Sequence, residues 1–331
     1  MAYTQVGIVN LALGRIGMKH ITTITESTPQ AEAANRVWEY IRDEVLEAKD
    51  WRFAKTREML SRAPVSPIYT YDYAYVLPND FLRLARSRDP LNDPVFYPIS
   101  VLDYKFESLQ LPEGLEKVTN GAFTGASTGW VLGTGWTYGT NNVAKVAGAV
   151  NTLSQAYDSM VSAPVVGESY QLSVVLSSFS GGALLPKVGG TNGSPISTED
   201  TWTQIIEASS ATDGITFTPM DPDVAVTLDT VSLFKVADRL CILTDYEDDE
   251  DNPVYITYIK KVTDVTQYSP SFISVLAWRL AAEMSIYLPE SRMKFADCWS
   301  QYELALTRAE GLTQSLDQEE QSSNDWEMAG R

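Results

Sequence analysis

The sequence predicts an α+β protein in which a helical bundle with a small sheet, built from both ends of the chain, carries an inserted all-β domain. Residues 118–234 contain 14 of the 20 glycines but only two lysines. No arginine occurs between Arg88 and Arg239, whereas the flanks are rich in Arg, Glu, Ala and Leu. Glycine turns between short Val, Leu and Thr runs are typical of strands. We therefore expect a host domain at 1–116 and 238–331 and an insert at 117–237.

The composition limits the classes of function. The formal net charge is -18 and the sequence pI is about 4.4, which argues against a free nucleic-acid-binding protein, because such proteins need basic patches. No apolar run reaches the ~18 residues of a membrane span, and the first five residues lack signal-peptide features. Two cysteines, Cys241 and Cys298, are too few for a disulfide framework and are typical of a reducing compartment.

Two helices are predicted near the N-terminus. The first carries an apolar stripe at three- and four-residue spacing and ends at Gly17. Its stripe consists of Val6, Val9, Leu13 and Ile16. Ser27 and Gln30 resemble a capping box for the second helix, with Pro29 in the first turn. The expected buried face of that helix is Ala34, Trp38, Ile41 and Val45. We expect Trp51-Arg52-Phe53 to lead out of it as a short strand.

Several strands are predicted in the host. Tyr71, Tyr73 and Tyr75 alternate, as on one half-buried face of a strand, although an exposed contact surface remains an alternative. Residues 240–243 and 254–259 are predicted to pair as a hairpin. Between them, six of the seven residues 245–251 are acidic. The glycine and glutamate that a calcium loop requires are missing from their positions, which favours a solvated hairpin tip.

Two further helices follow. Ser269-Pro270 predicts the start of the first, and Pro289 its end. Its expected inner stripe is Phe272, Leu276, Leu280, Met284 and Tyr287. The second has coiled-coil spacing over two heptads, through Phe295, Trp299, Tyr302, Leu306 and Ala309. After Leu316 the chain is polar and acidic, so we expect a tail that frays or docks on a partner.

Several short strings resemble the head–tail adaptor family of short-tailed bacteriophages, also called tail tubular protein A or connector adaptors. Their order extends over some 200 residues outside the insert. The strings are Leu13-Gly14-Arg15-Ile16-Gly17, Trp51-Arg52-Phe53-Ala54, Tyr73 to Arg83, Tyr255-Ile256, Val262-Thr263-Asp264, Tyr268-Ser269-Pro270-Ser271-Phe272 and Leu276 to Ala281. The insert interrupts the family pattern between about Phe106 and Arg239.

The resemblance implies a structural virion protein of the phage neck, made in the bacterial cytoplasm. Such adaptors form a dodecameric ring that binds the portal protein and a tail nozzle protein, and genome DNA is ejected through the ring without specific binding. The implied portal-side residues are Trp299, Tyr302, Leu306 and Trp326, and those on the nozzle or lumen side are Asp248, Asp249 and Glu250. A negative lumen would offer DNA no sites to bind; the alternative is that acidity only keeps the free protein soluble.

Within the insert, Tyr170 to Val174 alternate as in a half-buried strand. The glycine–tryptophan turns and the closing Asp229-Thr230-Val231-Ser232-Leu233 string resemble carbohydrate-binding-module-like jelly-roll sandwiches. That resemblance implies glycan stacking on Trp130, Trp136 and Trp202; the alternative is that these rings belong to the core. It also implies a structural calcium at Asp229 and the Asn120 region, and we expect no other cofactor.

No catalytic machinery is predicted. His20 is the only histidine, and a lone His at a helix end more often interacts with the helix terminus than it catalyses. No P-loop or nucleophile motif occurs. We expect a structural adaptor rather than an enzyme. The rival hypotheses are a glycan-binding module presented by a helical scaffold, for host-surface contact or capsid decoration, and a tail enzyme that degrades polysaccharide.

Overall fold

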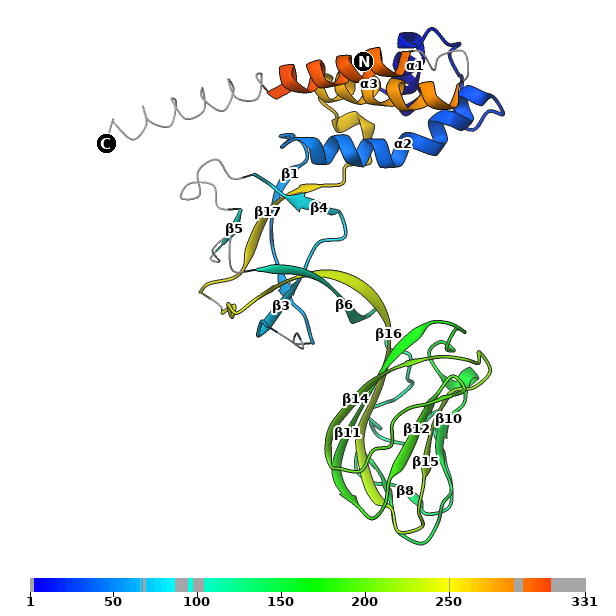
Figure 1. Cartoon of the computed structure of the whole chain (residues 1–331). Coiled ribbons are helices and arrows are strands. Elements are labelled where there is room, and N and C mark those ends of the chain that lie inside the picture. Colours follow the sequence, from blue (N-terminus) through cyan, green and yellow to red (C-terminus); the bar gives the residue numbers. More distant parts are fainter. Residues whose placement is uncertain are drawn as a thin grey trace, which may run out of the picture. The chain divides into compact units, whose positions relative to one another are not determined.

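The computed structural model describes residues 3–65, 67, 70–86, 95–97, 104–249, 251–288 and 294–310. The chain has a mixed α+β fold, with helices and several antiparallel sheets (Figure 1). It divides into two compact units. Unit 1 comprises Met1–Arg62, Tyr71–Lys105 and Thr244–Arg331, and unit 2 comprises Ala63–Thr70 and Phe106–Leu243. Both ends of the chain thus lie in unit 1.

The two N-terminal helices have clear end signals. Helix α1 (Gln5–Arg15) is followed by Gly17, whose φ of 71° suits glycine. Helix α2 (Pro29–Ala48) buries the predicted stripe, but its N-cap differs from the prediction. The cap is Thr28, whose hydroxyl accepts the backbone N–H of Ala31. The expected capping box at Ser27 is therefore wrong by one residue.

Helix α3 (Pro270–Tyr287) begins at the expected cap, because the Ser269 hydroxyl accepts the backbone N–H of Phe272. Its inner side is buried as predicted up to Met284, whereas Tyr287 is exposed. The predicted stop at Pro289 lies outside the described residues. A further helix occupies residues 295–310, and the tail beyond it also lies outside the described part of the chain. α1, α2, α3 and the helix at 295–310 share one hydrophobic core.

One sheet of unit 1 has the central strand β17 (Tyr255–Lys260). Its antiparallel neighbours are β1 (Lys55–Met59), β4 (Phe81–Leu84) and β5 (Phe96–Tyr97). Outside this sheet, β2 (Ser61–Arg62) pairs with β3 (Tyr73–Val76). In β3, Tyr75 is buried and Tyr73 partly buried. The predicted tyrosine row is therefore confirmed only for Tyr73 and Tyr75, because Tyr71 precedes the strand, and Ala74 on the opposite face is buried as well.

Two local predictions in unit 1 are wrong. Trp51-Arg52-Phe53 is not a strand but a turn, closed by a hydrogen bond from the Ala54 N–H to the Trp51 carbonyl. The second error concerns the expected hairpin: residues 240–243 belong to β16 (Ala225–Thr244), while β17 pairs with β1, β4 and β5. The acidic stretch 245–251 thus connects strands of different sheets. A short 3₁₀ turn, η2 (Val265–Gln267), precedes α3.

Unit 2 contains two antiparallel sheets (Figure 1). One has the order β13-β12-β15-β10-β7, formed by Thr191–Asn192, Leu184–Val188, Ile215–Pro219, Leu153–Gln155 and Val131–Leu132. In the other, β11 (Ser169–Ser180) lies between β14 (Asp200–Glu207) and β16. The strands β6 (Lys105–Glu113) and β9 (Val143–Lys145) also pair with β16, and β8 (Trp136–Tyr138) pairs with β9. A 3₁₀ turn, η1, spans Tyr157–Ser159.

One core lies within unit 2 and takes side chains from both sheets. In β11 alternate residues from Tyr170 to Leu176 are buried, as the alternation predicted. The opening loop approaches β16 so closely that a Cβ at Gly121 would collide with the carbonyl oxygen of Val231. Backbone contact at this distance requires glycine.

No helix within the described residues is long and apolar enough to cross a membrane.

Candidate functional site

Two strings that carry the adaptor resemblance meet in the core of unit 1. The ring of Phe272 lies edge-on to Trp51 at a centroid distance of 5.0 Å and to Phe53 at 5.1 Å. Tyr268 completes this aromatic cluster, 4.7 Å from Phe272 and 5.7 Å from Phe53. Edge-to-face geometry is the favoured arrangement for such pairs. The cluster therefore joins residues more than 200 positions apart in sequence.

A buried arginine joins three helices of the same unit. Arg279 on α3 forms two hydrogen bonds to the carboxylate of Glu44 on α2, at 3.0 and 2.9 Å. Its third nitrogen donates to Glu283 at 2.9 Å, and its guanidinium lies 4.8 Å from the ring centroid of Trp299. Such a two-pronged pair of guanidinium and carboxylate holds the side chains in a defined orientation in addition to attracting them by charge. Burial lowers the pKa of Arg279, but the hydrogen bonds to Glu44 and Glu283 outweigh this effect, so the pKa is raised.

The predicted portal-side residues mostly pack inward. Tyr302 is 6% exposed, and Trp299 and Leu306 pack against the core of unit 1. Trp299 Nε1 also donates to Glu303 at 2.8 Å. The coiled-coil spacing therefore corresponds to the face by which the helix at 295–310 packs on the core of its own chain. Trp299, Tyr302 and Leu306 do not form an exposed contact surface. The outward side of the same helix includes Leu304, which is 40% exposed. Trp326 lies outside the described residues.

The acidic stretch is held by a tyrosine from β3. The phenol of Tyr75 donates to the carbonyl of Tyr246 at 2.8 Å and accepts the backbone N–H of Asp248 at 2.9 Å. Burial raises the pKa of Tyr75. Asp249 caps the following turn by accepting the backbone N–H groups of Asp251 and Asn252. The stretch thus has a defined local structure with exposed carboxylates, while Glu250 lies outside the described residues.

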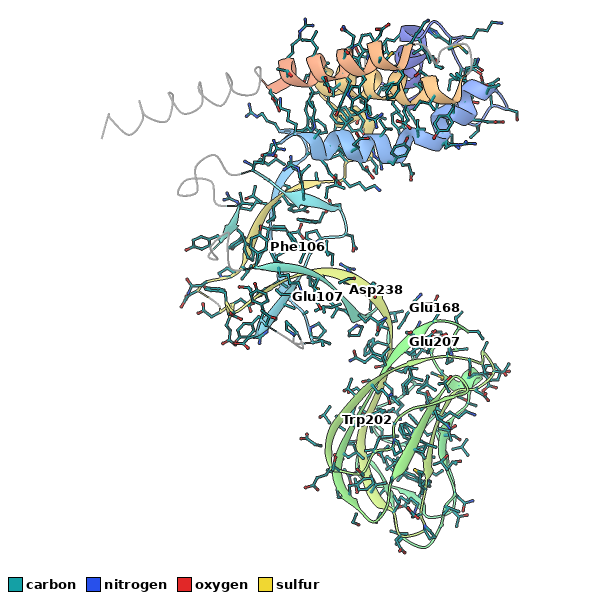
Figure 2. The ribbon with its side chains drawn as sticks, in the orientation of Figure 1. Phe106, Glu107, Glu168, Trp202, Glu207 and Asp238 are labelled. Atoms are coloured by element: carbon teal, nitrogen blue, oxygen red, sulfur yellow. The ribbon has the colours of Figure 1, made fainter. Side chains whose placement is uncertain are left out.

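The three tryptophans of unit 2 differ in access. Trp130 and Trp136 are 6% and 5% exposed, and their ring nitrogens donate to main-chain carbonyls, for example Trp136 to Asn151 at 2.7 Å. They are core residues, so the expectation that they stack on glycans is corrected. Trp202 on β14 is only partly buried (Figure 2). It pairs in register with the inward-facing Val174.

The expected calcium residues are described, but they do not form a charged cluster. The amide of Asn120 is engaged by the chain itself, accepting from the Thr124 N–H at 2.8 Å and donating to the Ala126 carbonyl at 2.7 Å. Asp229 lies at a register shift between β11 and β16. Within the described residues, no three His, Cys, Asp or Glu side chains gather as metal ligands would.

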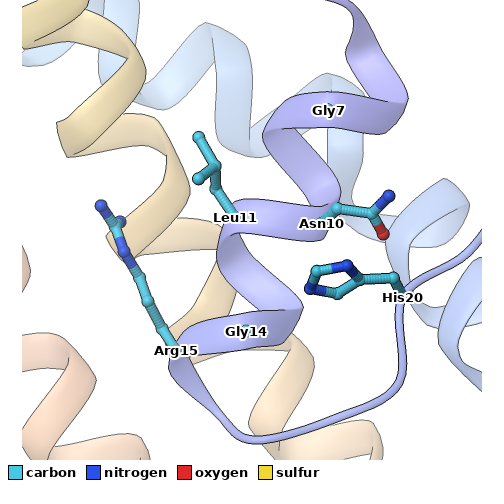
Figure 3. A pocket seen from close by; sticks show the side chains of 6 residues that line it. All are labelled: Gly7, Asn10, Leu11, Gly14, Arg15 and His20. Atoms are coloured by element: carbon cyan, nitrogen blue, oxygen red, sulfur yellow. The ribbon is translucent and has the colours of Figure 1, made fainter.

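Sequence reasoning missed a groove along α1 (Figure 3). Its volume is about 480 Å³, and its lining residues are Gly7, Asn10, Leu11, Gly14, Arg15 and His20. Asn10 is held in place, because its amide exchanges two hydrogen bonds with the main chain of Ile21. The sequence signal that could have indicated it is the pair Gly7 and Gly14 inside α1, since a glycine in a helix interior destabilises the helix by roughly 1 kcal/mol.

Potential catalytic groups are dispersed. His20 is exposed at the edge of the groove. Cys241 and Cys298 are free and buried, and they belong to different units. Burial raises the pKa of the Cys241 thiol to about 11. The thiol is therefore protonated at neutral pH, whereas a nucleophilic cysteine must be a thiolate.

No protein-family model matches this sequence, and no curated protein matches it.

Proposed function

We propose that this chain is a structural virion protein of a short-tailed bacteriophage, the head-to-tail adaptor that forms a ring between the portal and the tail nozzle. The observation that carries the proposal is the aromatic cluster of Trp51, Phe53, Tyr268 and Phe272. These residues come from two family-like strings on opposite sides of the insert, and they pack as parts of one core. An adaptor body interrupted by a separate domain requires this arrangement.

The helical part of unit 1 fits the bundle expected of an adaptor, and unit 2 fits an inserted jelly-roll sandwich. In this role the chain has no catalytic step and needs no cofactor. The portal contact falls to the outward side of the helix at 295–310, which includes Leu304, because the opposite side is buried on the chain's own core. The acidic stretch 245–251 faces the nozzle or the lumen. Its carboxylates repel passing double-stranded DNA, which therefore moves through the ring without being bound.

The test is assembly on the portal. The full-length protein is mixed with the portal of its phage and examined by native mass spectrometry and electron microscopy. The expected result is a closed ring on the portal, with twelve copies as in the family that the sequence resembles. Leu304→Asp places a charge on the outward side of the last helix and should weaken portal binding at least tenfold, on the order of 1.4 kcal/mol or more. Failure of the wild-type protein to bind the portal would refute the proposal.

The second candidate, a glycan-binding module, is favoured by one observation: Trp202 is only partly buried, whereas Trp130 and Trp136 are buried. A glycan array probed with the full-length chain tests this function. A signal that is lost in Trp202→Ala but kept in Trp202→Phe supports binding by ring stacking. Absence of any signal in the wild type refutes it.

A further inference from the structure

We draw no further inference here: the strongest candidate, the patch of exposed aliphatic side chains on the loops that follow β6 and precede β11 in unit 2 (Leu115, Val161, Val165 and Val166), carries no proposal because nothing in the described part of the chain shows what covers it.

Discussion

Replacing Phe272 by alanine should destabilise unit 1 selectively. Phe272 is fully buried and contacts three other aromatic rings from both sides of the insert. Truncating a buried Phe costs about 3–5 kcal/mol, because the lost transfer free energy adds to the cost of the cavity. The upper part of that range is appropriate here, since Trp51, Phe53 and Tyr268 all lose an edge contact. A loss of about 4 kcal/mol raises the opening equilibrium of unit 1 by roughly a thousandfold.

Hydrogen exchange measured by mass spectrometry is the suitable assay, because it reports on each segment and does not assume a single unfolding transition. Peptides from α1, α2 and α3 should exchange faster by up to that factor, while peptides from β11 and β15 keep their protection. Phe217→Ala is the matched control. Phe217 is equally buried, but in the core of unit 2, so it should produce the opposite pattern. Equal acceleration in both units, or a change in unit 1 below about 1 kcal/mol, would refute the reasoning.

Four further predictions concern single groups. Thr28→Ala should destabilise unit 1 by about 1 kcal/mol in urea unfolding through loss of the α2 cap, whereas Ser27→Ala should be nearly neutral; the reverse order would reject the cap. Arg279→Met should cost about 3 kcal/mol, the low end of the range for breaking a buried ion pair, because Glu283 and the more exposed Glu44 lose their partner. Arg279→Lys should recover only part of this loss. Equal stability of both variants and the wild type would contradict the prediction. Burial lowers the pKa of Lys145 below 10.5, so between the folded and the unfolded pKa the unfolded chain binds more protons than the folded one. The stability of unit 2, compared with that of Lys145→Met, should therefore increase as the pH rises toward 10.5. A decrease in this stability difference with rising pH would contradict the prediction. Both buried thiols should resist alkylation at pH 8 until the protein is denatured, which a spectrophotometric thiol titration checks; rapid reaction in the native state would disprove it.

The sequence predicted those elements whose pattern is local. The stripe through Val9, Leu13 and Ile16 and the alternation from Tyr170 to Val174 each reflect the period of a single helix or strand, and the structure has both. Caps are less certain, since Ser27 and Thr28 are both good N-cap residues and only the backbone geometry distinguishes them.

The errors arose where distant partners decide the structure. Residues 240–243 and 254–259 look like a hairpin in isolation, but β17 instead pairs with β1 and β4, which lie far away in sequence. The alternation of Trp51 and Phe53 is that of a strand, but the two residues lie in a turn from which both rings pack against Phe272. The apolar spacing through Trp299 and Tyr302 predicts that this face of the helix is buried, but it does not distinguish burial on the same chain from burial against another protein. The groove was missed because it depends on how the turn after α1 places His20 beside Gly14.

The aromatic cluster also affects the order of events during synthesis. A ribosome that adds 5–20 residues per second needs roughly 10–40 s to travel from Trp51 to Phe272. The core of unit 2 comes from one nearly continuous stretch, so it can close while the C-terminal helices are still being made. Helices α1 and α2 must wait with their apolar faces uncovered. The nascent chain is therefore an expected client of cellular chaperones, and the last part of the chain to be made completes the part made first.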